Sequence, residues 1–189
     1  MARLPYVDPA TAAEPVRAAL EALPVTLNVF RMMAHAETNF RPLLRLGSSI
    51  LAEQELSAKL RELAILRVAH LDDAQYEWAQ HVPVAKATGA NDVQIEALEA
   101  GDIWAACFDQ DEQLVLRFTT EVVQDVRASD ATFAAMAERF SAREIIELIL
   151  AIGYYMMMAR LMETTGIELD TVAGATLYEH AKRGLGRGR

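Results

Sequence analysis

The chain has 189 residues, of which 52% are hydrophobic, and its formal net charge is −9. That acidic balance argues against nucleic acid as the main partner, because neutralising phosphates requires a basic surface. No apolar run reaches the roughly 20 residues of a bilayer span, and the only cysteine, Cys107, excludes an intrachain disulfide. We therefore expect a cytoplasmic protein that contacts neither nucleic acid nor membrane.

An extended arm over residues 1–10 precedes a series of helices, and the sequence contains no sustained strand alternation. Proline and glycine breaks together with capping residues predict helices over 11–23, 26–34, 38–53, 56–71, 72–89, 91–101, 109–128, 129–140 and 142–165. The start signals are Asp72 with Gln75, Asn91, Asp109 with Glu112, Ser129, and the Ser141–Glu144 capping box. These patterns predict an all-α multi-helix bundle.

We expect a single structural domain with three parts. Residues 1–55 form the N-terminal arm and helices, residues 56–175 form the core, and residues 176–189 form a short C-terminal helix and basic tail. The glycine-broken end KRGLGRGR is predicted to be disordered. The last long helix is dense in Met and Tyr, which suggests burial on most sides, as in the core of an oligomer.

The candidate site lies in residues 56–89, where two helices are joined by an acidic turn at 71–73. On the second helix Ala74, Glu77, Trp78, His81 and Ala85 share one face, with Glu77 and His81 one turn apart. On the first helix Glu62 lies between apolar neighbours, and a buried carboxylate is unfavourable unless it is paired. The nearest expected partners are Glu77 and His81, although the candidates also include Arg41, Arg45, Arg61 and Arg67.

Three interpretations of Glu62, Glu77 and His81 follow. The first is structural: a buried glutamate held by an arginine, and a histidine without chemistry. The second is a proton-handling site, because a carboxylate orients one imidazole nitrogen and leaves the other free as acid or base. The third is a metal site of two carboxylates and one histidine. No Gly-rich phosphate loop is present, so no cofactor is expected, and Cys107 is expected to be inert packing.

Residues 56–100, with the block YEWAQH, resemble the carboxymuconolactone decarboxylase family, which includes the alkylhydroperoxidase D-like proteins. The peroxidase branch carries a C-x-x-C-x-x-x-H motif and an upstream glutamate. Here Glu62 and His81 occupy the glutamate and histidine positions, whereas Ala74 and Glu77 replace the two cysteines. A disulfide-type peroxidase is therefore not expected, because its cycle needs two thiols.

The resemblance implies an orthogonal helical bundle of this family's type, assembled as a homo-oligomer, often a trimer or hexamer. It implies a pocket between the two core helices and a small-molecule substrate. We expect a decarboxylase-like lyase that performs acid–base chemistry on a small carbonyl or lactone acid. His81 would be the general acid or base, Glu77 its orienting partner, Glu62 the buried relay, and Ala74, Tyr76 and Trp78 would shape the pocket.

Two alternatives stay open beside that expectation. The chain can instead be a small-molecule-binding or structural oligomer that retains the fold without the chemistry. The second alternative is a residual alkylhydroperoxidase-like activity, in which an external thiol acts through Cys107. Arg67 and Arg45 are the candidate cations for binding a carboxylated substrate.

Overall fold

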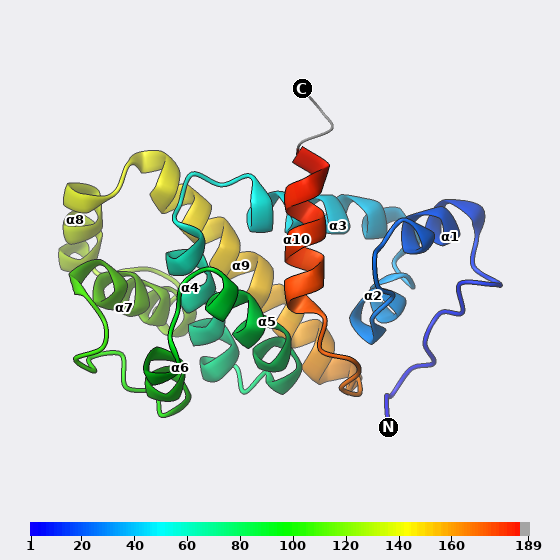
Figure 1. Cartoon of the computed structure of the whole chain (residues 1–189), viewed down its shortest axis with the longest axis horizontal. Coiled ribbons are helices and arrows are strands. Elements are labelled where there is room, and N and C mark those ends of the chain that lie inside the picture. The colour runs from blue at the N-terminus through cyan, green and yellow to red at the C-terminus, as the bar shows by residue number, and fades with distance from the viewer. Residues whose placement is uncertain (186–189) are drawn as a thin grey trace.

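The computed structural model describes residues 1–185, and those residues form α-helices joined by turns and loops, without strands (Figure 1). The prediction of an all-α bundle is confirmed. The helices are α1 (Glu14–Glu21), α2 (Asn28–Met33), α3 (Glu37–Ala52), α4 (Ala58–Leu71), α5 (Gln75–Ala87), α6 (Asp92–Glu99), α7 (Gln110–Asp125), α8 (Asp130–Arg139), α9 (Ala142–Thr165) and α10 (Gly174–Leu185).

Most of the predicted helix starts are found in the structure. Asn91, Asp109 and Ser141 each form a complete capping box with the residue three positions later, and Ser129 caps α8. Each box satisfies two backbone N–H groups that the helix itself leaves unpaired.

The predicted cap at Asp72 was wrong. Asp72 ends α4, Asp73 takes a left-handed conformation (φ 51°), and Ala74 becomes the N-cap of α5 without a side-chain hydrogen bond. The Asp72 carboxylate instead accepts a hydrogen bond from Arg160 of α9 at 2.8 Å. This hydrogen bond therefore connects the turn between α4 and α5 to a third helix, α9.

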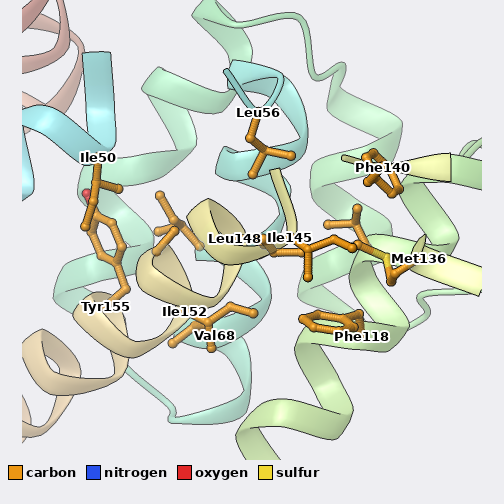
Figure 2. Packing of buried hydrophobic residues seen from close by; sticks show 14 residues of the cluster. Ile50, Leu56, Val68, Phe118, Met136, Phe140, Ile145, Leu148, Ile152 and Tyr155 are labelled. Atoms are coloured by element: carbon orange, nitrogen blue, oxygen red, sulfur yellow. The ribbon is translucent and has the colours of Figure 1, made fainter. Parts of the chain in front are cut away.

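Helix α4 lies at the centre of the bundle and packs against α5, α7 and α9. Its buried residues run continuously from Arg61 to Ala69, so it is enclosed on nearly all sides. Val68 of α4 belongs to one buried cluster with Ile152 and Leu148 of α9 and Phe118 of α7, and Figure 2 shows Val68 beside Ile152. Each fully buried aliphatic or aromatic side chain of this kind stabilises the fold by roughly 1.5–3 kcal/mol.

Helix α9 runs through the middle of the molecule (Figure 1) and is buried along one side. By length and composition alone it is apolar enough to cross a membrane, but Ile145, Leu148 and Ile152 belong to the core around α4. The opposite side of α9 is different, because Ile146, Leu150 and Met157 are exposed there.

Helix α10 packs against α3 and α5 (Figure 1), which brings the end of the chain over the candidate site. The prediction of a disordered end was wrong for Lys182–Leu185, which form the last turn of α10. The remaining residues of that prediction, 186–189, lie outside the described residues.

Candidate functional site

A cavity of about 160 Å³ lies between α3, α5, α9 and α10, and residues in and just before α2 also line it. Its wall is mostly aliphatic and aromatic, and none of the described residues that line it is lysine or arginine. Its polar or ionisable residues are Ser48, Tyr76, Glu77, Gln80, His81, Tyr154, Tyr155 and His180. The cavity therefore suits a small guest that is largely apolar and carries no negative charge.

One face of α5 supplies the largest group of polar residues. Tyr76, Glu77, Gln80, His81 and Val84 all line the cavity. Their spacing of three and four positions places them on one side of a helix. The opposite side of α5 is packed toward the cluster around Leu63, Leu66 and Leu98, so the orientation of α5 is fixed by the core.

Glu62 and His81 meet across the interface between α4 and α5. His81 Nδ1 donates a hydrogen bond to Glu62 Oε2 at 2.8 Å, and Arg61 Nε donates to Glu62 Oε1 at 3.1 Å. Glu62 is 0% exposed and the His81 side chain is 12% exposed. With Nδ1 committed to Glu62, the other ring nitrogen, Nε2, carries the lone pair of the neutral imidazole.

Two further contacts support this pair. The Tyr155 ring meets the His81 ring edge to face, with centroids 4.6 Å apart and an interplanar angle of 83°. The Arg61 guanidinium lies 5.8 Å from the centre of the Tyr178 ring of α10. The imidazole is thus held by a hydrogen bond on one side and by an aromatic ring on another.

Of the four candidate arginines, Arg61 is the one that pairs with Glu62. Arg41 and Arg45 are exposed, and Arg67 Nε donates to the Thr120 hydroxyl at 2.9 Å. Neither Arg45 nor Arg67 lines the cavity, so neither candidate cation is placed to bind a carboxylated substrate there. The reason is their direction: Arg67 projects toward α7 and Arg45 toward solvent.

Glu77 does not play the part predicted for it. The orienting partner of His81 is Glu62, and neither carboxyl oxygen of Glu77 has a hydrogen-bond partner among the described residues. Burial, followed by the negative charges of Asp72, Glu163 and Glu62, raises the pKa of Glu77 well above its ordinary value. The prediction paired His81 with Glu77 because they lie one turn apart on α5. In the structure, Glu62 reaches the imidazole ring from α4.

The predicted pocket residues divide between two places. Tyr76 lines the cavity and its hydroxyl donates to Asp170 Oδ1 at 2.8 Å. Ala74 and Trp78 do not line it; they border a separate surface depression together with His70 and Glu99. Ala74 and Trp78 do not line the cavity because both lie to one side of the α5 face formed by Glu77, Gln80 and Val84.

Several residues of the site were not predicted. Gln80 Oε1 accepts from the Ala173 backbone N–H at 2.9 Å, and its Nε2 donates to the Thr171 carbonyl at 3.1 Å. Gln80 thereby fixes the start of α10 over the cavity. A helical wheel of α5 places Gln80 on the same face as Glu77, so helical spacing could have identified Gln80. No local pattern indicates that Tyr154, Tyr155 and His180 line the same cavity.

The metal alternative receives no support from side-chain geometry. Within residues 1–185, no group of three or more His, Cys, Asp or Glu side chains is arranged to hold a metal ion. Glu62 is already hydrogen-bonded by Arg61 and His81, and Glu77 forms a hydrogen bond with neither Glu62 nor His81. Cys107 is a half-buried free thiol whose sulfur lies 3.8 Å from the Val93 carbonyl oxygen, and it does not line the cavity.

Comparisons with known proteins agree with the resemblance inferred from the sequence. Residues 38–121 match the model of the carboxymuconolactone decarboxylase family. No curated protein sequence matches the chain.

Solved structures of the same fold cover most of the chain. An uncharacterised peroxidase-related protein with an alkylhydroperoxidase AhpD core, from Ralstonia eutropha JMP134, superimposes with a TM-score of 0.78 at 15% identity, over 96% of each chain. A peroxidase-related protein from Silicibacter sp. TM1040 has a TM-score of 0.77 at 16% identity, over 92% of this chain and 94% of that one. A cysteine-to-alanine variant of the debrominase Bmp8, bound to 2,3,4-tribromopyrrole, has a TM-score of 0.69 at 18% identity, over 88% of this chain and 89% of that one.

Proposed function

We propose that this chain, a carboxymuconolactone decarboxylase family protein over residues 38–121, catalyses proton transfer on a small neutral molecule without a cofactor. The Glu62–His81 hydrogen bond at the wall of an apolar cavity is the observation that supports this proposal. His81 is the general acid and base, and Glu62 is the residue that positions it.

The chemistry follows from the pairing. Nε2 of His81 takes a proton from a carbon next to a carbonyl group, and the C–H electron pair moves into the carbonyl as an enolate forms. The Glu62 carboxylate stabilises the imidazolium that results. Returning the proton to a different carbon of the same conjugated system isomerises the substrate and restores the neutral imidazole.

The charge of the cavity argues for a neutral substrate over the lactone acid expected from the resemblance. Among the described residues that line this cavity, there is no lysine or arginine to pair with an anionic carboxylate. A buried charge without a partner is strongly unfavourable. Decarboxylation of a free carboxylate is therefore a poorer proposal than proton transfer, which needs no anionic group on the substrate.

A debrominase of the same fold holds a small halogenated aromatic ring, which is consistent with a small apolar guest here. Disulfide-type peroxidase chemistry is not proposed, because Cys107 is the only cysteine. We propose a cytoplasmic homo-oligomer as the working form, since the exposed apolar side of α9 would be covered by a second copy.

The test follows deuterium from D2O into neutral unsaturated lactones and cyclic enones by NMR, with wild-type protein and His81→Gln. We expect wild type to accelerate exchange at one carbon, and His81→Gln to lower the rate about 10²–10⁴-fold. A His70→Gln control, on α4 and outside the cavity, should retain most of the rate. Equal rates for wild type and His81→Gln would refute the proposal.

The second candidate is a binding protein without catalysis, which the apolar cavity alone also supports. The two are separated by recovering the bound compound. A ligand that stabilises the protein and returns chemically unaltered, without deuterium, favours the binding protein.

A further inference from the structure

We propose that the Glu77 carboxyl group binds the guest directly, and that the guest is a small neutral ring whose N–H or O–H donor lies beside a hydrogen-bond acceptor. Cyclic amides are the simplest compounds of this class. The inference rests on the proposed function only in placing the guest in the same cavity.

The first support is the isolation of the Glu77 side chain. The residue is 2% exposed and lines the cavity, yet neither carboxyl oxygen has a partner among the described residues. Buried polar atoms are paired in most native structures, so two free oxygens on one cavity wall indicate that the partner is a guest. The structural role first expected for Glu77, orienting His81, is already filled by Glu62.

The second support is the charge around Glu77. Burial is the largest cause that raises the pKa of Glu77. The negative charges of Asp72, Glu163 and Glu62 raise it further. Both causes favour the protonated form of the carboxyl group, and that form presents one O–H donor and one carbonyl acceptor on the same edge. A cyclic amide carries the complementary acceptor and donor.

The third support is the size of the cavity. Its volume of about 160 Å³ is close to that of the roughly 150 Å³ engineered cavity that takes up benzene. One five- or six-membered ring fits, and the aliphatic wall covers its remaining edges. Ring size and hydrogen-bonding edge together define the proposed class.

The experiment measures binding by isothermal titration with three probes of similar size: 2-pyridone, N-methyl-2-pyridone and benzylammonium. We expect wild type to bind 2-pyridone, and to bind N-methyl-2-pyridone, which lacks the donor, about tenfold more weakly. Glu77→Gln keeps a donor and an acceptor and should change 2-pyridone affinity by less than about threefold, whereas Glu77→Leu should lose about tenfold.

Three results would overturn the proposal. They are no binding of 2-pyridone to wild type, equal affinities of Glu77→Leu and wild type, and tighter binding of benzylammonium than of 2-pyridone, which would show an ionised Glu77. Binding is measured without turnover, so this test is independent of the proton-transfer test.

Discussion

Oε2 of Glu62 lies 2.8 Å from Nδ1 of His81, and this contact joins the two central helices of the candidate site. The carboxylate is fully buried and shared with Arg61, so it is held in place before any substrate arrives. The imidazole gains a fixed tautomer and a fixed direction from it, and both are properties that acid–base catalysis requires.

Removing the Glu62 charge should destabilise the fold. Glu62→Gln leaves Arg61, which is 2% exposed, as a buried cation without its anion. We expect the free energy of unfolding to fall by about 3 kcal/mol, measured by urea denaturation. Glu179→Gln is the control, because the Glu179–Lys182 pair is half exposed and should contribute little. Equal effects of the two substitutions would contradict the account.

The raised pKa of Glu77 predicts a specific dependence of stability on pH. Because the folded pKa lies above the ordinary value of 4.5, the contribution of Glu77 is fully present below pH 4.5 and is lost as the pH rises through the folded pKa. Relative to Glu77→Gln, wild type should lose up to about 1.4 kcal/mol of unfolding free energy per pH unit in that window. A constant difference between pH 4 and pH 8 would show that Glu77 ionises normally.

Glu121 provides the control with the opposite sign. Burial raises the pKa of Glu121, but hydrogen bonds from the Ser129 backbone, Thr132 and Arg117 outweigh it and lower the pKa to about 2. Its stabilising contribution is therefore present above pH 4.5 and is lost as the pH falls toward 2. The advantage of wild type over Glu121→Gln should shrink on acidification, measured by the same urea titrations.

Gly174 should tolerate no side chain. A Cβ atom there would overlap the backbone carbonyl oxygen of Gln80, at the point where α10 approaches α5. We expect Gly174→Ala to lower the free energy of unfolding by about 1–3 kcal/mol and to make the start of α10 more sensitive to protease. The control is Thr176→Ala, an exposed position on the same helix where alanine favours helix formation. A Gly174→Ala protein as stable as wild type would contradict the packing of α10.

The exposed side of α9 predicts self-association. Ile146, Leu150 and Met157 follow one another at helical spacing, and Leu150 is 50% exposed. We expect light scattering to give wild type a mass of more than one chain, and Leu150→Glu to lower that mass. Val93→Glu, at an apolar position on α6 that is 59% exposed, should leave the mass unchanged. A one-chain mass for wild type would contradict the proposed homo-oligomer.

The helices were predictable because their signals are local. Capping boxes at Asn91, Asp109 and Ser141 need only residues three positions apart, and those starts were found where expected. The start of α5 was misassigned because Asp72 pairs with Arg160, a residue far along the chain. The tertiary contact prevailed over the local capping preference.

The site was only partly predictable for the same reason. Helical spacing places Glu77 near His81, and the apolar surroundings of Glu62 indicate its burial. Spacing does not show which carboxylate reaches Nδ1, nor that Arg61 is the cation beside it. The cavity depends on the contact between Gly174 of α10 and Gln80 of α5, two residues that meet only after folding. Local spacing therefore does not show which side of α5 lines the cavity, and Ala74 and Trp78 border a separate depression instead.

The most direct test of the central claim is ¹⁵N NMR of the His81 imidazole, assigned by its absence in His81→Gln, at a pH where the ring is neutral. The account predicts a hydrogen on Nδ1, a free lone pair on Nε2, and a shift of the Nε2 resonance when 2-pyridone is added. A hydrogen on Nε2, or an Nε2 resonance that 2-pyridone leaves unchanged, would contradict it.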